Sequence, residues 1–369
     1  MWMIIFLALP IAGITYVSWH LWTLLPVATV WKCLAVGILV ASILILFLNF
    51  RGWLENMPLT LARINYEIGT SSIFVLMYLV MIFLLLDLGR LVRLVPHSWL
   101  HANAVTAVAI AGTMITLFVC ANINYNKKVR VTLSIATAKP LPHDYRIVML
   151  SDMHLGYHNN RKELARWIDM INQERADLIL IAGDIIDKSV IPLLKENMAA
   201  EFHRLSAPVY ACLGNHEYYS GSPKARQFYR DAGIHLLSDS SVVVDSAIVI
   251  IGRDDRSKAR RKNVLQLMDE VRRDSAAMSL YTILLDHQPY ELELTEQAGI
   301  DFQLSGHTHR GQVWPISWIT DALYECSWGS HSRGNTLYYV SSGIGIWGGK
   351  FRIGTQSEYV VATLKGNAK

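Results

Sequence analysis

Cysteine is scarce and scattered in this sequence. The four cysteines are Cys33, Cys120, Cys212 and Cys326, and no two of them have the spacing of a zinc ribbon or a redox motif. Nothing therefore indicates a disulfide framework, and the redox compartment stays open. An excess of charge is lacking as well, because the formal net charge is only +4. A charge this small does not predict binding to nucleic acid, and no protein partner can be inferred.

Charged residues are almost absent from four long apolar runs in the first 125 residues. The runs lie near residues 2–25, 33–50, 70–88 and 103–122. Each approaches the roughly 20 residues that a helix needs to cross a bilayer. The first run has no basic segment and no small-residue cleavage site, which predicts a retained span and not a signal peptide. We therefore predict an all-helical transmembrane region of about four helices over residues 1–125.

Side chains that could carry a charge near neutral pH within these runs are limited to His20 and Asp87, which lie near the ends of their runs and could reach the interface. Transport and proton relay usually require charged groups at membrane depth. We therefore expect the region to anchor the protein and not to form a pathway.

The distribution of basic residues predicts the orientation in the membrane. Four spans place both termini and the loop of residues 51–69 on one side. That side carries Arg51, Arg63, Lys127, Lys128 and Arg130, and the opposite side carries Lys32, Arg90 and Arg93. By the positive-inside rule, the C-terminal part of this multi-pass cell-membrane protein faces the cytoplasm, and a different number of spans would reverse this.

Beyond residue 126 the sequence turns polar, and short apolar runs alternate with helical patterns. A first strand is expected near residues 129–135, and further strands are expected at 146–150, 178–182, 209–213, 242–251 and 282–285, with one more beginning near Asp301. Helices are expected at residues 161–173, 193–204 and 263–272. This alternation predicts an α/β domain with a largely buried sheet over residues 126–369.

Five short motifs in this domain contain Asp, Asn and His residues that could bind metal ions. They read Asp152-Met-His154, Gly183-Asp184-Ile-Ile-Asp187, Gly214-Asn215-His216-Glu217, His287 and Gly306-His307-Thr-His309. Each follows a predicted strand, where open α/β sheets bind ligands. We expect the glycines to supply backbone conformations that other residues adopt only at a cost. Oxygen and imidazole ligands without thiolate suit Mn, Fe, Zn or Co, and the set is large enough for two divalent ions.

In this order the motifs closely resemble the calcineurin-like metallophosphoesterase family, whose pattern is DxH, GDxxD, GNH[DE], H, GHxH. The resemblance covers about residues 143–365, and residues 304–312 look most like a bacterial branch that often carries N-terminal membrane segments. It implies a double β-sheet sandwich flanked by helices, in agreement with the α/β alternation. It also implies that one metal is held by the residues matching Asp152, His154, Asp184 and His309, and the other by those matching Asp184, Asn215, His287 and His307.

The chemistry that the resemblance implies is hydrolysis at phosphorus. Two cations about 3.5–4 Å apart that share Asp184 would lower the pKa of a bridging water and hold the resulting hydroxide in line with a phosphorus atom. His216 would protonate the leaving oxygen or stabilise the charged transition state. Asp187 could orient His216, although a carboxylate in a turn or a helix cap is the competing interpretation.

Two further motif neighbours are less clear from the sequence. Arg310 could contact a substrate phosphate, because guanidinium pairs bidentately with phosphate oxygens, but many relatives have glycine there and a surface arginine is the alternative. Glu217 is assigned no catalytic role, since a supporting hydrogen bond or a solvent contact accounts for it. The remaining histidines of the domain are expected to be ordinary surface or loop residues, namely His143, His158, His203, His235 and His331.

Two segments outside the motifs bear on the substrate. The basic stretch of residues 253–262, which includes Asp255, would face an anionic leaflet or begin a solvated helix. Residues 313–328 are rich in Trp, Ile, Leu and Tyr, as in a cap over acyl chains, an interfacial aromatic belt or a packed core. With the anchor, these segments favour an amphiphilic phosphoester or pyrophosphate, such as a UDP-diacylglucosamine-type lipid precursor, over a soluble nucleotide.

We therefore predict a membrane-anchored phosphohydrolase with two metal ions, whose partners are the lipid bilayer and a phosphorylated, amphiphilic substrate. A nuclease-type phosphodiesterase is disfavoured, since no long basic groove or stacking series is visible. The alternative that is not an enzyme is a membrane scaffold or sensor that binds a phosphorylated ligand without turnover. It is disfavoured because every position of the motif array is filled. The choice among monoester, diester and anhydride stays open.

Overall fold

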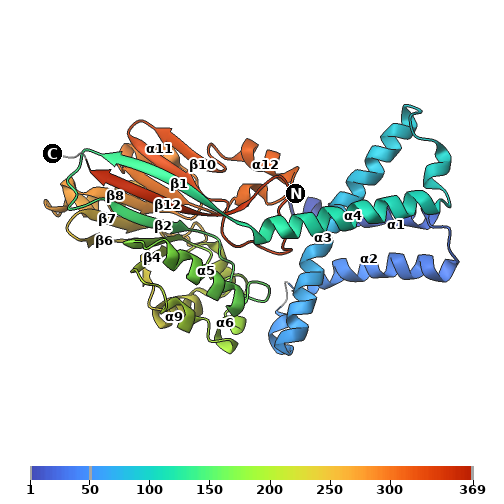
Figure 1. Ribbon diagram of the computed structural model, residues 1–369, viewed down its shortest axis with the longest axis horizontal. Helices are drawn as coiled ribbons and strands as arrows, with labels where there is room; N and C mark the ends of the chain where they lie inside the picture. Colours follow the sequence, from blue (N-terminus) through green and yellow to red (C-terminus); the bar gives the residue numbers. More distant parts are fainter. Residues whose placement is uncertain (1, 50–51, 367–369) are drawn as a thin grey trace. The chain divides into compact units, whose positions relative to one another are not determined.

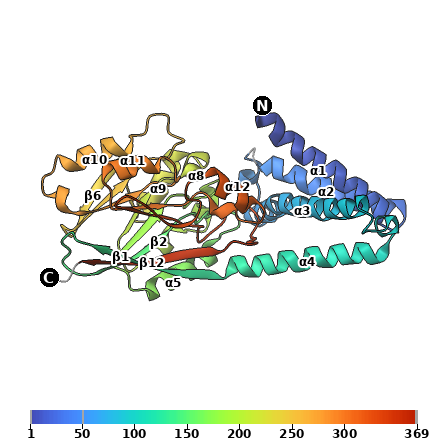
Figure 2. The ribbon, with the colours of Figure 1, turned by 90° about the horizontal axis from the view of Figure 1, so that it is seen from above.

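The computed structural model describes residues 2–49 and 52–366, without the side chains of residues 2–7 (Figures 1 and 2). The chain forms two compact units. One consists of Met1–Ile123 with Gly348–Lys350, and the other of Asn124–Trp347 with Phe351–Lys369. The last residues of the final apolar helix thus belong to the second unit.

The first unit is helical throughout its described part. Its long helices are α1 (Trp2–Leu24), α2 (Thr29–Asn49), α3 (Leu59–Leu91) and α4 (Ala104–Asn126). Helices α2, α3 and α4 are long and apolar enough to cross a membrane. The first predicted span coincides with α1, but it includes residues 2–7, whose side chains lie outside the described residues.

Helix α3 is longer than the predicted span of residues 70–88. It has 33 residues, which corresponds to about 50 Å of helix, whereas the hydrocarbon core of a bilayer is about 30 Å thick. A membrane-spanning helix of this length would tilt or extend beyond the hydrocarbon. Arg63 lies inside this helix, so the prediction that it belongs to a loop is wrong. Apolar periodicity could not reveal this extension, because its first two turns mix polar and apolar residues.

His20 and Asp87, the two residues of the apolar runs that could be charged near neutral pH, bind each other. His20 Nε2 lies 3.0 Å from Asp87 Oδ2, and the Tyr16 hydroxyl donates to the same oxygen at 2.7 Å. His20 is buried and stacks on the ring of Phe83. The polar cluster joins α1 to α3, as expected for a membrane segment in which a charged group needs a partner.

Two six-stranded sheets form the second unit. The first sheet has the order β1-β12-β2-β3-β4-β5. Its strands are β1 (Lys128–Thr137), β12 (Ser357–Gly366), β2 (Tyr145–Leu150), β3 (Leu178–Ala182), β4 (Val209–Cys212) and β5 (His235–Leu236). The second sheet has the order β10-β11-β9-β8-β7-β6. Its strands are β10 (Gly329–Arg333), β11 (Thr336–Val340), β9 (Phe302–Ser305), β8 (Tyr281–Leu285), β7 (Ile248–Gly252) and β6 (Ser240–Val244).

The core lies between the sheets and beneath the helices on their outer faces. Ile147 and Leu180 of the first sheet and Ile248 and Phe302 of the second share one buried cluster between the sheets. Helices α5 (Arg161–Gln173) and α9 (Ser222–Asp231) pack on the outer face of the first sheet. Helices α10 (Val264–Arg272) and α11 (Leu292–Ala298) flank the second (Figure 2). The predicted double β-sheet sandwich flanked by helices is confirmed.

Local chain reversals account for the errors in the predicted elements. Residues 242–251 form an antiparallel pair, β6 and β7, joined by a turn in which Asp245 and Ser246 both have a φ of 52°. The predicted helix of residues 193–204 is divided at Asn197, which has a φ of 50°, into α6 (Ile191–Lys195) and α7 (Ala199–Phe202). Helix α5 has the predicted bounds, because Asn160 caps it together with Glu163.

The strand directions bring the motif loops together. Strands β2, β3 and β4 are parallel to one another, and so are β7, β8 and β9. The loops that leave their carboxyl ends therefore lie along one edge of each sheet. Because the sheets are stacked, these two edges can contribute to a single site.

Candidate metal centre

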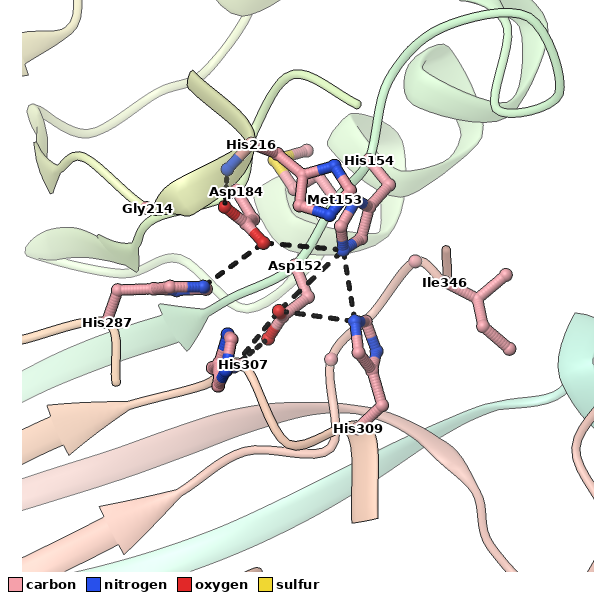
Figure 3. A network of polar contacts seen from close by, with 12 residues as sticks. Asp152, Met153, His154, Asp184, Gly214, His216, His287, His307, His309 and Ile346 are labelled. Carbon is pink, nitrogen blue, oxygen red and sulfur yellow. Dashed lines mark hydrogen bonds and ion pairs between the residues drawn. The ribbon is translucent and has the colours of Figure 1, made fainter. Parts of the chain in front are cut away.

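Each motif begins within three residues of a strand end. Asp152 follows β2, Asp184 follows β3, His287 follows β8 and His307 follows β9. Asn215 begins α8 (Asn215–Tyr219) directly after β4. Figure 3 shows the side chains of Asp152, Asp184, His287 and His307 converging with those of His154 and His309. The structure thus brings all seven residues predicted to bind metal into one region, and the prediction that they bind metal stays a prediction.

Left-handed backbone conformations are concentrated in these loops. Asp152, His154, Asp184, His307 and His309 have φ values of 53°, 46°, 53°, 71° and 48°. Residues other than glycine rarely adopt such values, and each instance costs about 1–3 kcal/mol. Strain of this kind persists only where the surrounding structure holds it, and it is typical of functional sites.

The motif glycines are required mainly by close packing. Only Gly183 has a positive φ, at 76°. A Cβ on Gly214 would lie 2.2 Å from Asp184 Oδ1, and a Cβ on Gly306 would lie 2.3 Å from Asp152 Oδ2. The expectation that every motif glycine supplies an unusual backbone conformation is therefore wrong for Gly214 and Gly306, whose missing side chains make room for the two carboxylates.

Asp152, His154 and His309 form one buried group of donor atoms. His154 Nε2 lies 3.0 Å from His309 Nε2, and His309 Nε2 lies 3.4 Å from Asp152 Oδ1. Donor atoms about 2.1 Å from a common ion lie about 3.0–3.4 Å from one another, so these separations suit a shared cation.

Burial and the nearby carboxylates set the pKa values of the histidines in this group. Burial alone would lower the pKa of His154, but hydrogen bonds to Asp152 and Asp187 raise it to about 10. Burial lowers the pKa of His309 to about 3. The two Nε2 atoms lie within hydrogen-bonding distance of each other. A bound cation would take the place of the proton between them, because metal ligation requires neutral imidazoles.

A second donor group lies beside the first and combines residues that follow strands of both sheets. His287 Nε2 lies 3.1 Å from Asp184 Oδ2 and 3.2 Å from Asn215 Oδ1. His307 Nδ1 lies 2.8 Å from Asn215 Oδ1. Asp184 Oδ2 also lies 3.7 Å from His154 Nε2 in the first group. The Asp184 carboxylate therefore lies between the two donor groups.

His216 lies beside the Asp184 carboxylate, with one ring nitrogen directed away from the donor groups. Its Nδ1 is 3.0 Å from the backbone oxygen of Asp187 and 3.3 Å from Asp187 Oδ1. Asp187 is fully buried, and its Oδ1 also lies 3.3 Å from His154 Nδ1. The carboxylate therefore contacts the imidazoles of His154 and His216. Burial opposes its ionisation, but its histidine neighbours keep the pKa of Asp187 far below the usual range.

Glu217 supports the loops that follow β3 and β4. It is buried, and its carboxylate accepts hydrogen bonds from the backbone N–H groups of Gly214 at 2.7 Å, Asp184 at 3.1 Å and Ile186 at 2.9 Å. Burial, followed by repulsion from Asp184, raises its pKa to about 7. The supporting hydrogen bonds favour the structural interpretation of Glu217 over a solvent contact.

Arg310 is half-buried beside the last motif. Its guanidinium stacks on the ring of Trp328, 3.9 Å from the ring centre, and pairs with no carboxylate within the described residues. The structure therefore leaves this cation available beside His309, and its contact with a phosphate stays a prediction.

The sequence interpretation missed His158. The expectation that it is an ordinary surface or loop histidine holds only in part, because His158 lies in a turn but is buried. Its Nε2 donates to the backbone oxygen of Ile346 at 2.7 Å, and its Nδ1 lies 4.0 Å from Asp187 Oδ2. His158 thus links Asp187 to the loop that contains Ile346, which Figure 3 shows beside His309. No motif marks this histidine.

Arg352 was also missed. It is fully buried, and its guanidinium donates to the backbone oxygens of His309 at 2.7 Å and Gly345 at 3.2 Å. Burial lowers its pKa to about 10. A Cβ on Gly345 would lie 2.2 Å from Met153 O, so this loop packs directly against the Asp152 motif. Arg352 therefore holds the backbone behind two of the predicted metal ligands.

Asn159 connects the first motif to the last turn of α4. Its side-chain amide donates to the backbone oxygens of Met153 at 3.0 Å and His154 at 3.1 Å, and its Oδ1 accepts from the Tyr125 hydroxyl at 2.6 Å. Tyr125 and Asn159 are both fully buried. The left-handed conformation of His154 is thus held by a side chain that Tyr125 orients.

We expect Asn159→Ala to weaken metal binding about 10–100-fold, as removal of outer supports of metal ligands typically does. Tyr125→Phe, which removes one hydroxyl, should give a smaller loss in the same direction. Isothermal titration of metal into the full-length protein measures both. Asn172→Ala, far from the motifs on α5, is the matched control. Unchanged metal affinity in both Asn159→Ala and Tyr125→Phe would contradict the role given to Asn159.

Comparison with known proteins agrees with this geometry. Residues 145–311 match the model of the calcineurin-like phosphoesterase family. An uncharacterized metallophosphoesterase of Aquifex aeolicus is 31% identical over 234 residues, which cover 62% of this chain and 87% of that protein. The chain belongs to the calcineurin-like metallophosphoesterase family. The predicted family is thus confirmed. Its members are metal-dependent phosphoester hydrolases.

Other relatives extend the comparison. An uncharacterized metallophosphoesterase of Campylobacter jejuni is 33% identical over 229 residues, 61% of this chain. The match spans about 60% of the length of that protein and of its Helicobacter pylori counterparts. A transmembrane protein with metallophosphoesterase domain from Danio rerio is 28% identical over 313 residues, 78% of this chain and 71% of that protein. With the apolar helices, this similarity identifies a membrane protein.

Solved structures are more distant. A putative 5'-nucleotidase of Staphylococcus aureus has a TM-score of 0.39 at 13% identity, covering 56% of this chain and 49% of that chain. A dimetal phosphatase from Danio rerio has a TM-score of 0.37 at 11% identity, covering 54% of this chain and 87% of that chain.

Proposed function

We propose that the protein is a multi-pass membrane phosphohydrolase with two divalent metal ions, which cleaves a phosphoester or pyrophosphate bond. One observation carries this proposal: two groups of buried donor atoms face each other across the Asp184 carboxylate. One ion would be held by Asp152, His154 and His309, and the other by Asn215, His287 and His307. Asp184 would bind both ions. Mn, Fe, Zn or Co suit these oxygen and imidazole donors. When bound, the ions would supply Lewis-acid stabilisation of phosphate oxygens and an acidified water.

The hydrogen bonds of His216 define its role in proton transfer. The backbone oxygen of Asp187 can only accept, so His216 Nδ1 carries a proton in every state of the ring. Proton exchange with a substrate must therefore take place at Nε2. The side chain is partly exposed, so a substrate can reach this atom. His216 would donate the Nε2 proton to the leaving oxygen, and Asp187 would hold the ring in place.

The basic stretch of residues 253–262 contributes less charge than its composition indicates. Arg253 and Arg261 pair with Asp286, and Lys258 and Lys262 pair with other carboxylates. Arg256 and Arg260 remain exposed, with no carboxylate partner in the described ranges.

Of these two arginines, Arg256 is better placed to contact a substrate at the predicted metal ligands. Its guanidinium lies over the ring of Tyr290, whose hydroxyl contacts that of Tyr324, and the Tyr324 ring is 6.4 Å from His307. A row of aromatic rings therefore leads from this cation to the predicted metal ligand.

We propose an amphiphilic substrate with an anionic headgroup, such as a nucleotide-linked lipid precursor, presented at the cytoplasmic leaflet. The membrane helices, the free cation Arg256 and the exposed aromatic residues after His309 support this choice. Arg310, beside His309, would contact a phosphate of the substrate. Nucleic acid is not an expected partner.

The test is hydrolysis by detergent-solubilised full-length protein of aryl phosphomonoesters, aryl phosphodiesters and lipid pyrophosphates, with Mn, with Zn or with EDTA. We expect turnover that requires metal and disappears with EDTA. A preference for the lipid pyrophosphate over the aryl esters would support the amphiphilic substrate. If the metal-loaded protein hydrolyses none of them, the protein is a membrane module that binds a phosphorylated ligand without turnover.

A further inference from the structure

The segment after the last predicted metal ligand carries an exposed apolar helix. In α12 (Ile316–Leu323), the side chains of Trp318, Ile319 and Leu323 are 65%, 57% and 70% exposed, and Ser317 is the buried residue of the helix. The ring of Trp314 packs edge-on against Trp318. Core packing, one of the three interpretations of this segment, is therefore wrong for α12.

The concentration of these side chains is unusual for the second unit. Its described residues include eight large apolar side chains that are strongly exposed, and four of them lie between residues 314 and 323. The others, Leu194, Tyr219, Val243 and Met278, occur singly. Single exposed apolar residues are normal on a soluble surface, whereas a contiguous group marks an interaction site.

Hydrogen bonds place the start of α12 beside the end of α4. The Asn124 amide, in the last turn of α4, donates to the backbone oxygens of Arg352 and Thr355, both at 2.9 Å. Between these two residues, Ile353 O accepts from Trp314 N at 2.7 Å. One short segment therefore has the end of α4 on one side and the start of α12 on the other. Since α4 is apolar enough to cross a membrane, its last turn marks the position of the bilayer surface.

The helix is also fastened to the metal-ligand loop. A Cβ on Gly311 would lie 2.4 Å from Ser317 N, so the loop packs tightly under the first turn of α12. The hydroxyl of Thr308, between His307 and His309, donates to Ser327 O at 2.6 Å beyond the end of the helix. Whatever α12 contacts is therefore held next to the predicted metal centre.

We propose that α12 is an interfacial helix, whose face formed by Trp318, Ile319 and Leu323 inserts among the lipid acyl chains of the bilayer that anchors the protein. Tryptophan favours the membrane interface, and short apolar helices at an interface bury their apolar face about 5–10 Å deep. The occupant of this surface is lipid. The predicted metal centre is thereby held at the level of lipid headgroups, where a phosphorus-containing headgroup can reach it. This inference does not depend on turnover.

A depth measurement on the full-length protein tests the proposal. In a Cys33→Ser, Cys120→Ser background, in which the remaining Cys212 and Cys326 are buried, an environment-sensitive fluorophore is attached at Ile319→Cys or Leu323→Cys. The protein is reconstituted in vesicles of phosphatidylcholine and phosphatidylglycerol, with and without phosphatidylcholine that carries a doxyl group on its acyl chain. The matched controls are Leu194→Cys and Met278→Cys, which are similarly exposed at 61% and 56%.

We expect the doxyl lipid to quench the labels at Ile319→Cys and Leu323→Cys at least about twofold, because a face buried 5–10 Å deep reaches the doxyl group. The control labels should be unaffected and should be quenched by aqueous iodide instead. Equal responses at all four positions, whether quenched by lipid or by iodide, would overturn the proposal. Because no step requires hydrolysis, an inactive protein with quenched α12 labels would contradict the proposed function alone.

Discussion

Asp184→Ala is expected to abolish metal-dependent hydrolysis and to reduce the bound metal. Asp184 Oδ2 faces both donor groups, and Asp184 Oδ1 accepts the backbone N–H of His216 at 2.9 Å. The substitution removes one oxygen donor from each predicted ion and releases the loop that carries His216. Because the ions contribute several kcal/mol of charge stabilisation, we expect kcat to fall more than about 10³-fold. Steady-state kinetics and elemental analysis of the purified protein measure both effects.

Two substitutions separate this effect from general destabilisation. Asp269→Ala removes an exposed carboxylate of α10 whose partner is Arg272, and it should leave activity and metal content unchanged. Asp184→Asn keeps the shape of the side chain but removes its charge, and it should lose metal as Asp184→Ala does. An Asp184→Ala protein that retains two equivalents of metal and normal turnover would refute the shared-ligand arrangement.

His216→Gln is expected to lower kcat about 10²–10⁴-fold, the usual contribution of a general acid. Metal content should be retained, because His216 Nδ1 contacts Asp187 and the seven other side chains supply the donor groups. The loss should depend on the leaving group. An ester of 4-nitrophenol, whose oxygen needs little protonation, should lose much less activity than an alkyl ester, which needs a proton.

The outcome distinguishes three roles for this histidine. Equal losses for both esters would assign His216 to stabilisation of transition-state charge and not to proton donation. Loss of metal would make it a ligand, since His216, His154 and Asp184 also lie close enough together to hold an ion. His203→Gln is the control, because His203 is exposed and bonds the backbone oxygen of Asp231.

Convergence of the motifs could be predicted because it depends on strand direction. Asp152 and Asp184 follow the neighbouring parallel strands β2 and β3, and His287 and His307 follow the neighbouring parallel strands β8 and β9 of the other sheet, so that each pair shares an edge. Residue type and position relative to a strand predicted which motifs would converge, whereas the division of their residues into metal ligands and other roles came from the family resemblance.

The residues that hold the ligand loops in place could not be predicted, because they bind backbone atoms. Asn159 and Arg352 bind backbone oxygens of the ligand loops, and a backbone oxygen has no signature in the sequence. His158 was misjudged for the same reason: its partner Ile346 is 188 residues away along the chain. The turn at Asp245 was missed because the apolar runs on either side of it read as one strand.

The contact between Tyr125 and Asn159 bears on how this protein can be divided. Tyr125 belongs to α4 by its backbone and to the second unit by its packing. A soluble fragment beginning at β1 would lack the hydroxyl that orients Asn159, and with it part of the support of the His154 loop. The membrane helix and the hydrolase fold are therefore not interchangeable modules. A chimera that replaces α4 needs a tyrosine in the same register of its last turn.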